Sequence, residues 1–286
     1  MISAVRPVSD DDLDYEVVAT HRKNKRGEPR PLELTAEVLG RYMEYEKRFL
    51  DPGGPVPDAS LSIADKSTLT ENADYLSLVH FNPLKMAILS AAPKRKCAYC
   101  YQLRATEVDH YLPKSVFGEY SIFSKNLVPI CRACNGTKLN RYRREFGGRR
   151  YLHPYFDDLR ADSVQFLGAT LSVDRSVTIK FDVFQPVGMN DELWQILQHQ
   201  FNELGLDVRY MEEAAEAISG MLGVLYSHYD RGGASELRHQ LDVVMRSKAR
   251  YYGTNHWEPV TMGALVASEA FCEGGFMLLG SRDHAI

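Results

Sequence analysis

The stretch that decides the fold reads Cys97-Ala-Tyr-Cys100, then Glu107-Val-Asp-His110, and finally Cys131-Arg-Ala-Cys-Asn135. It contains two Cys-x-x-Cys pairs separated by 30 residues. Each short turn can present two thiolates about 2.3 Å from one metal ion, so two such turns suit tetrahedral zinc. The chain has five cysteines, an odd number, and its acidic start does not resemble a secretory signal, so a disulfide framework is not expected. We therefore expect a structural Zn²⁺ bound by Cys97, Cys100, Cys131 and Cys134.

The segment between and after the cysteine pairs predicts a compact β-β-α unit. One strand is expected to bring Asp109 and His110 to its end, and residues 127–130 indicate a second short strand. A helix is expected from Arg132 to about Glu145. A unit of this size buries little core of its own, and a structural metal is the usual way to stabilise it.

An adjacent aspartate and histidine have clear chemical uses at such a strand end. The Asp109 carboxylate is a hard oxygen ligand suited to magnesium or manganese, and a neutral His110 imidazole can take a proton from water near pH 7. Phosphodiester hydrolysis needs both a cation at the phosphate and a base for the water. Asn135 offers an amide oxygen as a second metal ligand, and Asn126 could hydrogen-bond across the loop and hold His110.

The order Cys-x-x-Cys, Asp-His, Asn, Cys-x-x-Cys-Asn, with a lysine three residues further on, closely resembles the HNH (ββα-metal) endonuclease family over about residues 97–145. The resemblance implies that the four paired cysteines hold the structural zinc, that His110 is the general base and that Asn126 is the middle residue of the triad. It also implies that Asp109 and Asn135 bind the catalytic divalent ion, Mg²⁺ or Mn²⁺. Asn135 replaces the final family histidine, which leaves the preferred ion open.

Charge is distributed unevenly along the chain. The net charge is −4, yet residues 94–150 hold 13 Lys/Arg and 4 Asp/Glu, a net of +9, and the other 229 residues carry −13. A basic island in an acidic chain is typical of a phosphate-contacting module, so DNA is the expected partner. The candidate phosphate contacts are Lys138, Arg141, Arg143 and Arg144.

These patterns predict an α+β protein that is mainly helical and contains the zinc-stabilised ββα-metal finger, with a short β-hairpin after it. We expect a mainly helical N-terminal region over 1–92, the nuclease finger over 93–150, and a β-hairpin plus a C-terminal helical domain over 151–286. Within them we expect an irregular segment over 1–32, helices over 33–49, 69–80 and 83–91, hairpin strands over 164–171 and 177–184, and helices over 191–203, 211–227, 237–245 and about 258–272.

The flanking regions favour assembly over DNA binding, because their acidic charge should repel a duplex. They suit a homodimer or a protein partner such as an associated ATPase. No apolar run approaches the roughly 18 residues of a membrane span, so we expect a cytoplasmic protein without a membrane partner. Many HNH proteins with extra domains belong to bacterial antiphage or mobile-element systems, and by analogy we expect that this chain can belong to one.

The leading hypothesis is a metal-dependent DNA endonuclease, and two alternatives compete with it. A non-catalytic zinc-finger module that binds nucleic acid would explain the cysteines and the basic island, but not Asp109, His110 and Asn135. A scaffold protein with a remnant finger would not need an intact Asp-His pair. His153, which follows the finger, is either packed or exposed where the chain turns into the next region, or close to the scissile phosphate.

Overall fold

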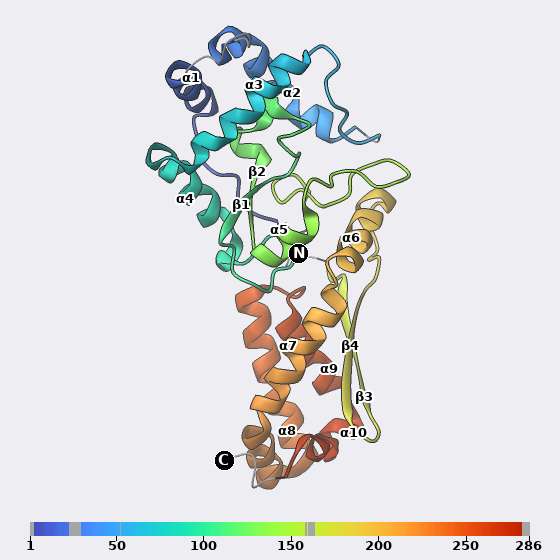
Figure 1. Cartoon of the computed structure of the whole chain (residues 1–286). Coiled ribbons are helices and arrows are strands. Elements are labelled where there is room, and N and C mark those ends of the chain that lie inside the picture. Colours follow the sequence, from blue (N-terminus) through green and yellow to red (C-terminus); the bar gives the residue numbers. More distant parts are fainter. Residues whose placement is uncertain (1–2, 23–29, 52, 158, 160–163, 282–286) are drawn as a thin grey trace. The chain divides into compact units, whose positions relative to one another are not determined.

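The computed structural model describes residues 3–22, 30–51, 53–157, 159 and 164–281 (Figure 1). These residues form two compact units. The first, which we call the finger unit, contains the described residues up to 157 together with Gln195–Gln200. The second, the C-terminal unit, contains the other described residues from Leu159 onward.

Helices precede the cysteine pairs in the finger unit and share its core. Helix α2 (Thr35–Phe49) places the buried Tyr42 against Phe123 and the buried Tyr45 against Tyr120, with ring centroids 4.1 and 4.8 Å apart. The loop that joins the two finger strands is therefore packed against α2. The helices are α1 (Asp11–His21), α2 (Thr35–Phe49), α3 (Ile63–Glu71) and α4 (Asn82–Ala91), with 3-10 turns at Pro31–Leu34, Asn72–Ser77, Val79–Phe81 and Pro93–Arg95.

Helix α1 contradicts the expectation that residues 1–32 are irregular. The side chain of Asp10 accepts a hydrogen bond from the Leu13 amide at 3.1 Å and caps the helix. Three aspartates in the first turn add negative charge at the positive end of the helix dipole, which stabilises the helix. This N-terminal signal, rather than an apolar stripe, marks the helix. For residues 1–2 and 23–29, which lie outside the described residues, the expectation stays a prediction.

The finger has the predicted ββα order. Strands β1 (Glu107–His110) and β2 (Leu127–Ile130) pair in antiparallel fashion, with His110 opposite Leu127, and α5 (Arg132–Lys138) follows directly. Together with the helices and a second hairpin, this confirms the α+β class.

Helix α5 ends at Lys138, so the prediction that it continues to about Glu145 is wrong. The next residue, Leu139, has φ 49° and ψ −133°, which no helix can include. The chain then folds back, and Arg143 forms an isolated antiparallel bridge with Arg149. The arginines after Lys138 are consequently held on a turn rather than along a helix.

The helix predicted over 69–80 also has different bounds. Helix α3 begins at Ile63 because Ser62 and Asp65 form a capping box, with side chain–backbone hydrogen bonds of 3.1 and 2.9 Å. After Glu71 the chain continues as 3-10 turns.

The C-terminal unit contains the predicted hairpin and helices. Its strand β4 buries Ile179, Phe181 and Val183, every second residue, as a strand with one covered face should. None of the helices in the described part of the chain is long and apolar enough to cross a membrane. The elements are β3 (Leu167–Val173), β4 (Val177–Val183), the two ends of α6 (Asp191–Glu203, whose residues Gln195–Gln200 belong to the finger unit), α7 (Leu206–Gly220), α8 (Leu222–Tyr252), α9 (Trp257–Ala267) and α10 (Glu269–Cys272).

Two helices predicted as continuous in the C-terminal unit are divided. The pattern over 211–227 belongs to α7 and α8, which meet at Met221. The last predicted helix divides at Ser268, whose hydroxyl accepts a hydrogen bond from the Phe271 amide and caps α10.

Candidate active site and zinc site

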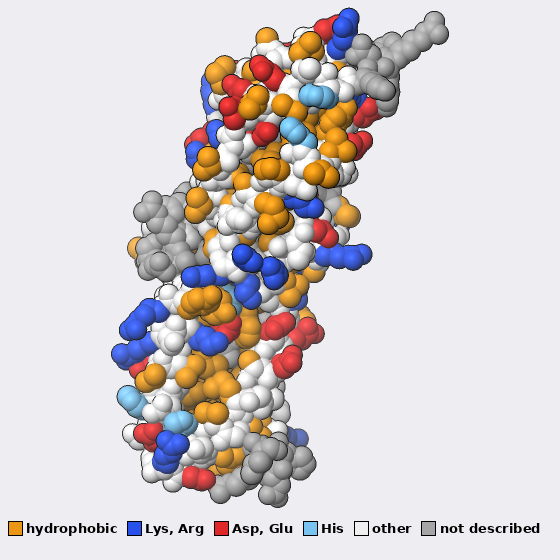
Figure 2. All heavy atoms as spheres, turned by 90° about the vertical axis from the view of Figure 1, so that its left-hand side faces the viewer, with side chains coloured by type: hydrophobic (Ala, Val, Ile, Leu, Met, Phe, Trp, Pro, Cys, Tyr) orange, Lys and Arg blue, Asp and Glu red, His pale blue; other side chains and the backbone are white. Residues whose placement is uncertain are grey.

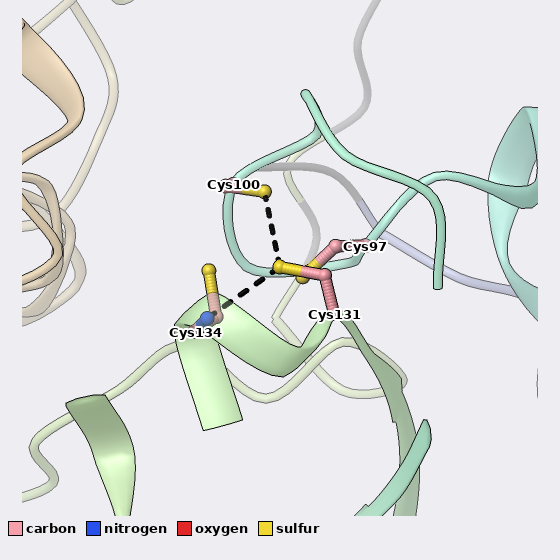
Figure 3. A group of neighbouring side chains, drawn as sticks. All are labelled: Cys97, Cys100, Cys131 and Cys134. Atoms are coloured by element: carbon pink, nitrogen blue, oxygen red, sulfur yellow. Dashed lines mark hydrogen bonds between the residues drawn. The ribbon is translucent and has the colours of Figure 1, made fainter. Parts of the chain in front are cut away.

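The four paired cysteines form one buried cluster (Figure 3). Cys97 and Cys100 lie on the turn before β1, whereas Cys131 and Cys134 lie at the start of α5. Their Sγ atoms all lie within 4.8 Å of one another, and those of Cys100 and Cys131 are 3.9 Å apart. Four thiolates around one tetrahedral zinc ion would be about 3.8 Å apart. The donor set and its geometry therefore fit a structural zinc.

The backbone of the first cysteine pair forms a tight turn that suits zinc binding. Tyr101, directly after the pair, has φ 51° and donates its amide to the Cys97 carbonyl at 2.8 Å, which closes a tight turn around the sulfurs. Burial raises the pKa of the Cys97 thiol well above its ordinary value. A bound cation is what would stabilise thiolates in so buried a position.

His110 is held in one tautomer by the chain itself. Its Nε2 lies 2.7 Å from the Ser121 carbonyl oxygen. A carbonyl only accepts hydrogen bonds, so Nε2 carries the proton and Nδ1 keeps its lone pair. Burial lowers the pKa of His110 below its ordinary value of 6.5, so the ring is neutral at pH 7. The Ser121 hydroxyl in turn donates to the Leu69 carbonyl of α3 at 2.8 Å.

Lys138 lies beneath Asp109 and His110 rather than on the surface. Its side chain is 1% exposed, its Nζ lies 2.8 Å from Asp109 Oδ2, and it donates to the His110 carbonyl at 2.8 Å. Lys138 is therefore too buried for the predicted contact with a DNA phosphate. It forms instead a buried ion pair with Asp109 that fixes the end of β1.

Asn135 is oriented by a residue that the sequence analysis missed. Its Nδ2 donates to Glu107 Oε2 at 2.8 Å. Glu107 and Asp109 are two residues apart on β1, and this spacing places them on the same face of the strand. That spacing was a signal available in the sequence.

Three of the predicted site residues line one hollow of about 460 Å³: Asp109, His110 and Asn135. Glu107 lines it as well. A carboxylate, an amide and a neutral imidazole thus face one space, which is the set of groups that a divalent ion and a water nucleophile need.

Asn126 lies outside this hollow, and its side chain is fully buried. Its Oδ1 accepts from the Leu112 amide at 2.8 Å, and its Nδ2 donates to the carbonyls of Leu112 and Tyr120 at 3.0 and 3.1 Å. Its own carbonyl accepts from the Tyr111 amide at 2.8 Å. Asn126 therefore fixes the backbone that follows His110 and is a positioning residue.

A buried hydrogen-bond chain extends from Asn126 to two residues outside the finger strands. The Tyr45 hydroxyl donates to Asn126 Oδ1 at 3.0 Å and lies 3.1 Å from His153 Nε2. The other ring nitrogen of His153, Nδ1, accepts from the Tyr155 amide at 3.2 Å, so Nε2 carries the proton and donates to Tyr45. His153 is fully buried, so it is packed in the core, as one of the two interpretations of the sequence expected. A buried ring cannot contact a phosphate, so the other interpretation, a position near the scissile phosphate, is wrong.

The remaining predicted phosphate contacts, Arg141, Arg143 and Arg144, do not line the hollow. Arg143 donates to the Gly53 carbonyl at 2.9 Å, and Arg144 donates to Gln195 Oε1 at 3.1 Å. Arg141 is exposed, but it does not line the hollow either. The turn after α5 uses at least two of these three arginines for contacts within the finger unit.

A ββα unit with a four-cysteine cluster and an Asp-His pair at the end of its first strand is the architecture of a ββα-metal nuclease. Residues 97–141 match the family model described as HNH endonuclease, and this segment of the chain is an HNH endonuclease domain.

Two curated proteins are similar to parts of this chain. Protein ea31 of Escherichia phage lambda is 29% identical over 128 residues, which are 44% of this chain and 43% of ea31. Septu protein PtuB of Bacillus thuringiensis is 35% identical over 60 residues, which are 19% of this chain and 23% of PtuB. The chain thus spans less than half the length of either relative. No solved structure matches it.

The cysteine cluster predicts one zinc ion per chain, to be measured by elemental analysis of protein purified without chelator. Cys97→Ser should lose this zinc and lower the melting temperature of the finger unit, because a structural site contributes its binding free energy to folding. Cys272→Ser is the matched control: Cys272 is also fully buried, but it lies in the C-terminal unit, outside the cluster. Native protein without zinc, or equal zinc in both variants, would contradict the assignment.

His153 predicts a pH dependence of stability. Burial lowers the pKa of His153 well below 6.5, so the folded state binds fewer protons than the unfolded state just below that pH. The unfolding free energy should therefore fall as the pH drops below about 6.5, by up to about 1.4 kcal/mol per pH unit for this one group. In His153→Gln this part of the slope should disappear, whereas in the exposed control His21→Gln it should persist. Urea unfolding of the three proteins between pH 5 and 7 is the measurement, and parallel slopes would refute the prediction.

Proposed function

We propose that this chain is a metal-dependent HNH endonuclease that hydrolyses phosphodiester bonds of DNA. The observation that carries the proposal is the single hollow lined by Asp109, His110 and Asn135, which lies within the segment that matches the family model. His110 there is neutral and has its Nδ1 lone pair available.

In the proposed reaction, His110 Nδ1 takes the proton of the attacking water. The Ser121 carbonyl keeps the ring oriented throughout, because it accepts a hydrogen bond from the Nε2–H group whether the ring is neutral or charged. The carboxylate of Asp109, the residue directly before His110 in the chain, stabilises the imidazolium that forms.

Asp109 and Asn135 are the residues that would hold the divalent ion, Mg²⁺ or Mn²⁺. When bound, such an ion supplies positive charge against the developing negative charge of the phosphate and the leaving oxygen. Lys138 pairs with Asp109 Oδ2, and Glu107 accepts a hydrogen bond from Asn135 Nδ2. Both proposed ligands are therefore oriented without a bound ion.

This geometry supports the two alternative hypotheses, a non-catalytic zinc-finger module and a scaffold with a remnant finger, less well than it supports a nuclease. A zinc-finger module that only binds nucleic acid needs the cysteine cluster, but it does not need a histidine fixed in the tautomer of a base. A scaffold with a remnant finger does not need Asn126 to use its Oδ1 and Nδ2 on the loop after His110.

The wider role is also a proposal. We infer that the regions outside the finger contribute to assembly, as a homodimer or with a protein partner such as an associated ATPase. A place in bacterial antiphage defence or in a mobile element is supported by the likeness to a phage protein and to a Septu protein.

His110→Ala tests the proposed chemistry. It should lower the rate of plasmid cleavage with Mg²⁺ or Mn²⁺ by about 10²–10⁴-fold, because it removes the general base, while folding and DNA binding persist. His80→Ala is the matched control, since His80 is an exposed histidine of the same unit. Cleavage by His110→Ala at the rate of the control would exclude His110 as the base.

Asp109→Ala should abolish cleavage through loss of the divalent ion, and excess metal should restore little of it. Binding of Mn²⁺ to the protein, followed by electron paramagnetic resonance, should weaken in parallel. Unchanged Mn²⁺ binding in Asp109→Ala would show that the ion lies elsewhere.

A further inference from the structure

Strand β1 separates two hollows that share part of their walls. Glu107, Val108, His110 and Asn135 line both of them. The first, of about 460 Å³, also contains Asp109, and the second measures about 370 Å³. His110 and Asn135 thus lie at the junction of two spaces rather than at the end of one.

The first hollow carries two cations besides the site residues. Arg132, the first residue of α5, and Lys114, on the loop after β1, both line it. Arg132 is exposed, and the Lys114 side chain is 42% exposed with Asp74 Oδ1 3.7 Å from its Nζ. Such an exposed ion pair is weak and does not prevent a phosphate from binding.

The second hollow is closed by residues that precede the HNH segment. Leu76 from the 3-10 turn Asn72–Ser77 and Ile88 from α4 form apolar walls, and Lys85 of α4 lines the hollow as an exposed cation. Figure 2, which faces the side on which α4 lies in Figure 1, shows hydrophobic, basic and acidic side chains interspersed on that side of the molecule. Apolar walls suit the carbon face of a sugar, and a cation suits phosphate oxygen.

The basic residues that line the hollows are not those that the sequence predicted as phosphate contacts. Among the described residues, neither Lys85 nor Arg132 forms an ion pair with a carboxylate. In contrast, Lys138 is buried against Asp109, and Arg143 and Arg144 are bound to Gly53 and Gln195.

We propose that the nucleic-acid strand to be cut crosses β1 through both hollows, with its phosphates on Arg132 and Lys114 on one side of His110 and on Lys85 on the other. The proposal rests on the proposed nuclease function and names its substrate contacts. It gives the N-terminal helical region a direct part in substrate binding, because Lys85 and the apolar walls of the second hollow come from that region.

Two charge-matched sets of substitutions test this track in the full chain. The first set combines Lys85→Gln, Lys114→Gln and Arg132→Gln, and the control set combines Arg141→Gln, Arg143→Gln and Arg144→Gln. Both are made in the His110→Ala background, so that binding of a fluorescent DNA duplex is measured without cleavage. Circular dichroism and zinc content establish that each protein is folded.

The first set should lower the affinity at least tenfold and flatten the plot of log affinity against log salt by about 0.9 for each phosphate that the protein no longer neutralises. The control set should stay within about threefold of the parent. Equal reductions of affinity in both sets, or a reduction in the control set alone, would overturn the track.

A single substitution in the active protein tests the contribution of α4. Lys85→Gln should raise the KM for DNA with little change in kcat, whereas Lys47→Gln, an exposed lysine of α2 away from both hollows, should change neither. If Lys85→Gln behaves like Lys47→Gln while the parent cleaves DNA, the track is wrong and the nuclease function stands. A parent that neither binds nor cleaves DNA would refute both.

Discussion

The geometry of the site depends on one buried amide, that of Asn126. Its side chain satisfies both the amide and the carbonyl of Leu112, and so closes the loop between β1 and β2 directly behind His110. Replacing it would leave several buried polar groups without partners, each at a cost of about 1–3 kcal/mol. Tyr45 and His153 extend the same chain of hydrogen bonds into α2 and into the segment after the finger. The loop is thus held by Asn126 at its own end and, through Asn126, by residues from two distant parts of the sequence, which explains how His110, the proposed base, can be fixed on so short a strand.

The buried ion pair of Lys138 with Asp109 solves a second problem of the same site. The Asp109 side chain is 12% exposed, and a carboxylate charge that is so largely buried is costly unless it is paired. Lys138 supplies the pairing through Oδ2, and its second hydrogen bond, to the His110 carbonyl, ties both site residues to the end of α5. The ammonium also limits how much negative charge the site presents to a phosphate, because it lies directly against the Asp109 carboxylate that lines the hollow.

What the sequence could and could not predict follows from the range of the forces involved. The cysteine pairs, the two strands and the Asp-His pair are defined by local spacing, and the resemblance to the HNH family could be stated from them; the family model confirms it. The positions of Lys138 and His153 depend on burial, which a pattern of charges does not reveal. Both side chains are buried, so neither contacts a phosphate as the sequence had suggested. Tyr45 had no local signal at all, because its partner Asn126 lies 81 residues away along the chain. Glu107 and the aspartates of α1 did carry local signals, one through strand periodicity and the other through helix capping.

The acidic charge of the flanking regions does not conflict with a substrate track that includes Lys85. At physiological salt, charges interact over about 8 Å, so a strand at the two hollows responds to the side chains that line them rather than to the net charge of the chain. The second hollow is formed jointly by α4, the 3-10 turn Asn72–Ser77 and the finger strands, all of which belong to the finger unit. The same unit contains α3, whose Leu69 carbonyl holds Ser121, which in turn orients His110. The residues that precede the first cysteine pair therefore contribute to the candidate site in two ways: they orient His110, the proposed base, and they form one wall of the second hollow.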